Sequence, residues 1–364
     1  MARKLTRRAL LGVIPIGLIA QTGTRTVAPT PRKAKPLPSV GEFTRITDGV
    51  TENLVVRLTS PAFTSHLTGL GNQFVSVRER LLLFSTNRTG HMAPFQVDLR
   101  NGALRQIAEA EKLDYRSLCL DRSQKAAYFL DGDRILEAAL GKGSNQTVAQ
   151  GVTWFRLGAD GALFAVQEGK LVLREGSGWR RLAEEAVACW PQPSGAGCLF
   201  ARTLNEHESQ FWYAASNGPS KPVLLASGRV RDPYWDTDGQ SILFLRYVTN
   251  AAGVMLAEIH GKGLNGEPEA FVSATSQFAT FAPNGDASVF VGASRSRAQP
   301  TIVLQLRTPS REMTLCEHAS KHPQDVLPSF SPDSRRVYFE SEHEGNPAIY
   351  SVSVEYLVEP LATG

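Results

Sequence analysis

The segment from residue 318 to residue 325 groups several candidate metal ligands. His318 and His322 lie four residues apart, and Gln324 and Asp325 follow them. Imidazole nitrogens with amide and carboxylate oxygens nearby can hold a divalent cation such as manganese. His66, in a Ser-His-Leu sequence, is a further candidate ligand. The alternative is a polar connecting segment with ordinary surface histidines, because no spacing here is diagnostic of a metal site.

The sequence lacks the strongest motifs of several enzyme classes. It contains no Gly-x-Ser-x-Gly elbow, no Walker loop and no His-Glu-x-x-His, so the usual cues for serine hydrolases, nucleotide-binding proteins and zinc proteases are missing. Residues 261–266 match the dinucleotide fingerprint in letters, but Glu267 and Pro268 follow where a helix should start, which predicts a hairpin loop. Residues 236–239 resemble the start of a calcium loop, but Tyr247 stands at the glutamate position, which predicts a β-turn.

Seven copies of one short pattern predict the elements that must position the candidate ligands. Each copy has turn residues followed by an apolar run that closes on phenylalanine, as in Phe-Ala-Pro-Asn-Gly-Asp-Ala-Ser-Val-Phe at residues 281–290. The copies end at Phe84, Phe129, Phe164, Phe200, Phe244, Phe290 and Phe339, 35 to 49 residues apart. Such a period with four strand-length runs is typical of a propeller blade. The sequence therefore predicts an all-β fold, a seven-bladed β-propeller of four-stranded antiparallel blades.

The repeat also argues against the main alternative fold and predicts how the ring closes. A β-sandwich has many short strands too, but it would not repeat one turn pattern seven times. Proline fixes φ at the second turn position, and Asp, Asn and Gly tolerate the left-handed conformation that follows. We expect the strand predicted within residues 43–59 to complete the seventh blade, so that no edge stays exposed.

The first forty residues differ in composition from the rest of the chain. Arg7 and Arg8 precede an uncharged apolar stretch over residues 9–20, the form of a twin-arginine export signal and too short to span a bilayer. Residues 21–39 are rich in Pro, Thr and basic side chains, which predicts a disordered tether. We therefore expect a signal peptide at 1–20, a tether at 21–39, a propeller at 40–364 with no transmembrane span, and a periplasmic or otherwise exported protein.

The net charge gives no support for nucleic-acid binding. The chain has 39 Lys plus Arg and 35 Asp plus Glu, a formal net charge of +4, and residues 1–20 contain four basic residues and no acidic one. Residues 21–364 therefore contain 35 basic and 35 acidic residues, a net charge of zero. Nucleic-acid binding needs a concentrated basic face, which this balance does not indicate.

The four cysteines do not have the spacing of a metal site. Cys119, Cys189, Cys198 and Cys316 all lie in apolar, strand-like runs, which predicts buried inert thiols. Cys189 and Cys198 flank one predicted turn and could pair across a hairpin. Because twin-arginine substrates fold before export, we do not expect obligatory disulfides.

Residues at the two ends of the repeat array carry a resemblance to known families. In the first blade they are residues 56–61, 83–90 and 97–102, and in the last blade residues 328–333 and 348–352. The first blade resembles the opening of oligogalacturonate lyases, and the last blade is similar both to that family and to TolB-type propellers. The resemblance runs over roughly residues 52–358 and is weak in blades two to four.

The lyase resemblance implies a manganese site and a reaction. Members of that family bind manganese with histidines and a glutamine at the inner blade ends, and they cleave unsaturated uronide disaccharides by β-elimination. In this chain Leu327 and Asp325 stand where two histidines are expected, and His322 stands at the glutamine position. His318 could match the remaining histidine. The resemblance therefore implies that the site has been rearranged or that the metal has been lost.

Two hypotheses of function follow. The first is a lyase-like protein that acts on or binds small uronides or another small carbohydrate, with His66, His318, His322 and Gln324 as metal ligands. In it, Arg231 is a candidate carboxylate clamp or base, and Arg246 is a weaker candidate. The second is a non-catalytic TolB-like scaffold that presents a rigid face to a periplasmic protein or ligand. The hypotheses differ in whether the histidines point into one cavity.

Overall fold

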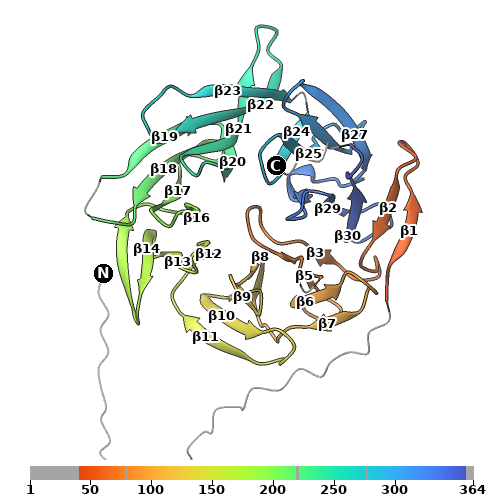
Figure 1. Cartoon of the computed structure of the whole chain (residues 1–364), viewed down its shortest axis with the longest axis horizontal. Helices are drawn as coiled ribbons and strands as arrows, with labels where there is room; N and C mark the ends of the chain where they lie inside the picture. The colour runs from red at the N-terminus through yellow and green to blue at the C-terminus, as the bar shows by residue number, and fades with distance from the viewer. Residues whose placement is uncertain (1–40, 79, 219–220, 276, 358–364) are drawn as a thin grey trace, which may run out of the picture. The chain divides into compact units, whose positions relative to one another are not determined.

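The structure, a computed structural model, describes residues 41–78, 80–218, 221–275 and 277–357. These residues form seven antiparallel sheets arranged as the blades of a ring (Figure 1). The predicted all-β, seven-bladed propeller is confirmed. The predicted export signal at 1–20 and nearly all of the region preceding the folded part, including the tether at 21–39, lie outside the described residues.

The first four blades follow one another along the chain. The first contains β3 (Ser65–His66), β4 (Val75–Ser76), β5 (Leu81–Thr86), β6 (Ala93–Asp98) and β7 (Leu104–Gln106). The second contains β8 (Leu113–Leu120), β9 (Ala126–Asp131), β10 (Arg134–Ala139) and β11 (Asn145–Ala149). The third contains β12 (Trp154–Leu157), β13 (Leu163–Gln167), β14 (Lys170–Glu175) and β15 (Gly178–Ala183). The fourth contains β16 (Ala188–Pro191), β17 (Gly197–Thr203), β18 (Ser209–Ala215) and β19 (Val223–Gly228).

The last three blades complete the ring. The fifth contains β20 (Val230–Trp235), β21 (Ser241–Thr249), β22 (Met255–Gly263) and β23 (Ala270–Thr275). The sixth contains β24 (Phe278–Pro283), β25 (Val289–Ser294), β26 (Thr301–Leu306) and β27 (Arg311–Glu317). The seventh contains β28 (Ser329–Phe330), β29 (Arg336–Ser341) and β30 (Ala348–Ser353), and it is completed by β2 (Leu54–Arg57) and β1 (Thr44–Thr47). A short 3-10 helix, η1 (Pro323–Asp325), precedes β28.

Pairing between the two ends of the chain closes the ring, as predicted. In β2, Val55 pairs with Val352 and Arg57 pairs with Tyr350 of β30, and β1 then pairs with β2. Beyond β2, the Leu58 amide donates to the Ile349 carbonyl at 2.7 Å. The seventh blade therefore holds strands from both ends of the described sequence and cannot form without the residues near position 55.

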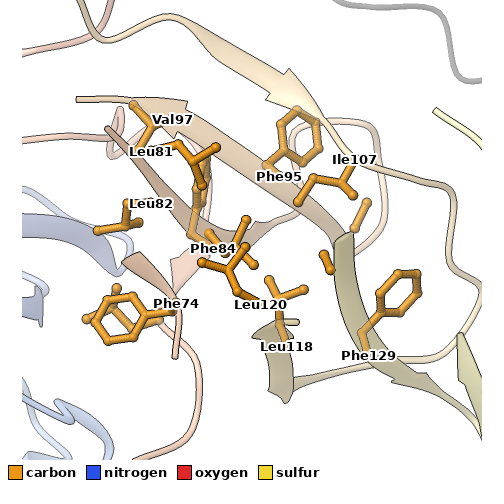
Figure 2. Packing of buried hydrophobic residues seen from close by; sticks show 14 of the residues in the cluster. Phe74, Leu81, Leu82, Phe84, Phe95, Val97, Ile107, Leu118, Leu120 and Phe129 are labelled. Atoms are coloured by element: carbon orange, nitrogen blue, oxygen red, sulfur yellow. The ribbon is translucent and has the colours of Figure 1, made fainter. Parts of the chain in front are cut away.

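The repeated phenylalanine lies on the second strand of every blade and is buried. The seven side chains have relative exposures of 0 or 1%. Figure 2 shows how this arises between the first two blades, where Phe84 lies beside Leu118 and Leu120 of β8. The phenylalanines thus fill the space between adjacent blades, because the faces of each blade are covered only by the neighbouring blades.

The turn before each second strand explains the local sequence. In the fifth blade the Gly239 amide donates to the Asp236 carbonyl at 2.9 Å, and Gly239 has a φ of +62°. The Asp238 carboxylate accepts from the Gln240 amide at 2.7 Å. The resemblance to a calcium loop is therefore accounted for by a β-turn. The strand β22 contains the glycine-rich residues up to Gly263, and Leu264 begins the loop to β23.

The first blade departs from the regular pattern. Its inner edge is split into β3 and β4, both paired with β5, and the chain between them passes toward the middle of the ring (Figure 1). There the Gly69 amide donates to the Arg116 carbonyl at 2.9 Å, and the Leu120 amide donates to the Gln73 carbonyl at 2.7 Å. We call residues 67–74 the inner loop. It covers β8 and forms part of the cavities described below.

Two smaller expectations concern the cysteines and the membrane. All four cysteines lie within the described residues, and they are buried free thiols. Burial raises the pKa of Cys119 to about 12, which makes this thiol unreactive. No helix in the described part of the chain has the length and hydropathy needed to cross a bilayer.

Candidate functional site

Two of the predicted histidines line one cavity. This cavity, which we call the histidine cavity, has a volume of about 180 Å³ and is lined by His66, Tyr115, His322, Asp325 and Glu340, among others. His66 comes from β3, whereas His322 caps η1. Residues more than 250 positions apart in the sequence meet here, because the first and seventh blades are neighbours in the ring.

A buried carboxylate holds His66 in place. The His66 Nδ1 atom lies 2.8 Å from Glu340 Oε2, and Glu340 Oε1 accepts from the Leu67 amide at 2.8 Å. The His66 ring stacks on Tyr115 with 4.4 Å between ring centroids. Burial raises the pKa of Glu340, and the hydrogen bond from His66 opposes that rise. Sequence reasoning missed Glu340 and Tyr115, because neither lies in a motif.

His318 lies outside this cavity, in the interior. Its Nε2 atom lies 3.2 Å from the Ser294 carbonyl oxygen, so Nε2 carries the proton, and Nδ1 accepts from the Ser320 amide at 3.1 Å. The side chain is fully buried, and this burial lowers its pKa to about 4. Both ring nitrogens are engaged, so coordination of a cation by His318 would require the ring to break at least one of these hydrogen bonds.

The remaining predicted ligands are dispersed. Gln324 is exposed on η1 and does not line the histidine cavity. Leu327 is buried with a φ of +47°, and it lines a different cavity. Within residues 41–357, where described, no three His, Cys, Asp or Glu side chains form a group that could hold a metal ion. In this arrangement the residues do not fit a manganese ion held jointly by His318, His322 and Gln324.

The pKa of His318 predicts how stability depends on pH. Below about pH 6.5 the unfolded chain protonates this histidine, whereas the folded protein does so only near pH 4. Neutral His318 therefore makes its full contribution to the free energy of unfolding above pH 6.5. This contribution, about 3 kcal/mol at most, is lost as the pH falls from 6.5 to 4. His318→Gln keeps a donor and an acceptor, so we expect it to flatten this dependence in urea unfolding between pH 7 and pH 4.5. His207 is exposed, so the control variant His207→Gln should leave the pH dependence unchanged. If wild type and His318→Gln lose stability equally as the pH falls, His318 is not the group responsible.

A second cavity gathers positive charge. This arginine cavity has a volume of about 230 Å³, and in the described structure Arg116, Arg156 and Arg231 line it together with Trp154, Trp190 and one carboxylate, that of Asp232. The side chains come from the inner strands of the second to fifth blades. Arginine guanidinium groups bind carboxylates through paired hydrogen bonds, and tryptophan rings offer flat apolar faces. The arrangement can therefore bind an anion that carries an apolar ring face.

A bulge in β20 positions Arg231. The pairing of β20 with β21 shifts register between Arg231 and Tyr234, and Asp232 has a φ of +50°. Bulges redirect side chains relative to the sheet. The Arg231 Nε atom donates to Asp232 Oδ1 at 3.2 Å, and the charge of Asp232 raises the pKa of Arg231. A guanidinium with a raised pKa is a poor base, so this environment favours the clamp over the base.

Arg116 connects the two cavities. Its guanidinium forms an ion pair with Asp325 and lies 5.6 Å from the centroid of the Tyr115 ring. Arg116 lines the arginine cavity, whereas Tyr115 and Asp325 line the histidine cavity. A ligand that spans both cavities would therefore contact residues of the first, second, fifth and seventh blades.

Arg246 occupies a different environment. Its Nε and Nη2 atoms donate to the two carboxylate oxygens of Glu269 at 2.5 and 2.6 Å. His260 lies 2.7 Å from the same carboxylate. Arg246 does not line the arginine cavity or the histidine cavity. Its geometry is that of a structural ion pair between β21 and the segment before β23.

Comparisons with solved structures give the same fold. Oligogalacturonate lyase from Vibrio parahaemolyticus is 16% identical with a TM-score of 0.76, covering 89% of this chain and 99% of that one. An oligogalacturonate lyase in complex with manganese is 17% identical with a TM-score of 0.75, covering 88% and 98%. TolB from Acinetobacter baumannii is 10% identical with a TM-score of 0.44, covering 80% and 79%. At these identities the likeness to the lyases confirms the predicted resemblance at the level of the fold.

Searches by sequence add no further relative. No protein-family model matches the chain, and no curated protein matches it significantly. The cavities themselves are therefore the main evidence on function.

Proposed function

We propose that this protein binds a small uronide, with the sugar carboxylate in the arginine cavity. The observation that carries the proposal is the convergence of Arg116, Arg156 and Arg231 on a cavity walled by Trp154 and Trp190. A uronide presents both features that such a cavity selects, a carboxylate for the cations and an apolar ring face for the indoles. The likeness of the fold to that of oligogalacturonate lyases supports the same class of ligand.

Binding is the part of the lyase hypothesis that the geometry supports best. β-Elimination also needs a base within reach of the proton α to the carboxylate. His66 is the group with that chemistry, because Glu340 holds its Nδ1 and leaves Nε2 to accept a proton. No step of the proposal uses a metal, because the residues described do not fit one. Export by the twin-arginine route stays a prediction.

Calorimetric titration of the protein with saturated digalacturonate tests the proposal. We expect binding by the wild type, and no binding of the neutral disaccharide of the same ring size. Arg231→Ala should weaken binding by about 10- to 100-fold, the usual effect of removing hydrogen bonds to a charged group.

Arg174→Ala is the matched control. Arg174 also lies over a tryptophan, 5.1 Å from the Trp179 centroid, but on β14 away from the arginine cavity. Its variant should bind like the wild type. Equal affinity for the neutral disaccharide, or an Arg231→Ala protein with unchanged affinity, would reject the uronide site and favour the scaffold hypothesis. If the absorbance of an unsaturated uronide falls when the protein is added, the protein has lyase activity in addition to binding.

A further inference from the structure

Arg156 is a buried cation without a counterion. Its relative exposure is 5%, and it forms no ion pair with any described carboxylate. Its Nη1 and Nη2 atoms donate to the carbonyls of Phe155 and Leu70 at 3.2 and 3.4 Å, and Nε has no partner in the described structure. The guanidinium lies 4.7 Å from the Trp154 centroid. A buried charge with such weak compensation is costly unless an anion binds it.

A third cavity lies on the other side of Arg156. This tryptophan cavity has a volume of about 390 Å³ and is lined by Asn72 of the inner loop, Arg156, Trp190, Tyr234 and Trp235, among others. It shares Arg156, Trp190 and Pro233 with the arginine cavity, but Arg231 and Arg116 do not line it. Arg156 therefore lines both cavities.

A second buried polar group belongs to a residue that lines the same cavity. The Tyr234 hydroxyl is buried and has no hydrogen-bond partner among the described residues. Leaving a buried hydroxyl without a partner is destabilising. Tyr234 belongs to β20 and Arg156 to β12, so two blades that are not adjacent each present an unsatisfied donor. An oxygen-rich anion can accept from both.

The walls and rim of the cavity suit a small anion. The Trp235 indole donates to the Trp190 backbone carbonyl at 3.0 Å, which fixes the Trp235 side chain. Arg122 lines the same cavity and is exposed, so a second positive charge lies toward solvent. Positive charge at the rim attracts anions, and the deeper guanidinium then holds them away from water.

We propose that the tryptophan cavity is a second ligand site, which shares Arg156 with the uronide site and binds a small oxyanion through Arg156 and the Tyr234 hydroxyl. The ligand class is a carboxylate or a phosphate, because either supplies the acceptor oxygens that the two donors require. The proposal does not depend on the uronide function, since Tyr234 lines this cavity and not the arginine cavity, although Arg156 lines both.

Thermal unfolding of the protein with inorganic phosphate, with acetate, and with chloride at matched ionic strength tests this site. An anion that binds only the folded state raises the melting temperature with its concentration by mass action. We expect phosphate or acetate to raise it in a saturable way and chloride to have no such effect. The larger of the two responses identifies the ligand class. Equal responses to all three salts would reject the site.

Tyr234→Phe separates this site from the uronide site. Without added anion, we expect the variant to be as stable as the wild type or more stable, because it loses an unsatisfied hydroxyl. Its affinity for the effective anion should fall at least tenfold, while its affinity for digalacturonate stays unchanged. Arg231→Ala should show the opposite pattern. A Tyr234→Phe protein that binds the anion like the wild type would overturn the proposal, whatever the result for digalacturonate.

Arg156→Met removes the charge and keeps a long apolar side chain. We expect this variant to lose the anion response entirely, whereas Arg174→Met should retain it. If Arg156→Met does not fold, the Tyr234→Phe measurement decides the matter. A folded Arg156→Met protein with the wild-type anion response would show that the anion binds elsewhere and would overturn the proposal.

Discussion

Replacing Phe244 or Phe290 with alanine is expected to lower the free energy of unfolding by about 3 to 5 kcal/mol. Both rings are fully buried on the second strands of the fifth and sixth blades. Phe244 meets Phe211 of the fourth blade edge to face at 6.0 Å, and Phe290 meets Phe281 at 5.9 Å. Alanine would leave cavities between sheets that are held at a fixed spacing by their neighbours, so little relaxation is possible. Urea unfolding measures the loss.

Phe271→Ala provides the control for these two variants. Phe271 lies on β23, the outer strand of the fifth blade, and is 59% exposed. Its replacement should change stability by no more than about 0.5 kcal/mol. A Phe244→Ala protein as stable as Phe271→Ala would contradict the assignment of the repeated phenylalanine to the space between blades.

The blade repeat could be predicted from the sequence because its causes are local. A turn such as the one at Asp236–Gly239 requires particular residue types. The strand that follows it must bury a large ring, here that of Phe244. Each copy carries this information within ten residues. The closure by β2 was also predictable, since a ring of seven blades with free edges would be open to pairing with other chains.

The cavities could not be predicted in the same way, because their residues come together only when the ring closes. His66 and Glu340 are 274 positions apart, and Arg116 and Asp325 are 209 apart. Arg156 does have a signal in the sequence, because it is an arginine inside the apolar stretch of residues 154–157. His318 and His322 are close in sequence, but Ala319 between them has a φ of +48°, and one histidine is buried whereas the other is exposed.

Removal of the imidazole that holds Glu340 should be strongly destabilising and dependent on pH. Glu340 Oε2 is 2.8 Å from His66 Nδ1, and the glutamate is buried whereas the histidine is partly buried. His66→Ala leaves a buried carboxylate with the Leu67 amide as its remaining partner. Breaking one side of a buried pair costs about 3 to 5 kcal/mol. We expect a loss of this size at pH 7, measured by urea unfolding.

The direction of the pH dependence follows from the pKa of Glu340. Burial already raises this pKa above its ordinary 4.5, and the loss of the His66 hydrogen bond removes a contribution that lowers it. The folded variant therefore keeps a proton that the unfolded chain releases above pH 4.5, so its stability falls as the pH rises. The cost of His66→Ala should thus be smaller at pH 5 than at pH 7. Adding Glu340→Gln to His66→Ala should abolish this difference, because the amide cannot ionise; a difference that persists in the double variant would assign it to another group.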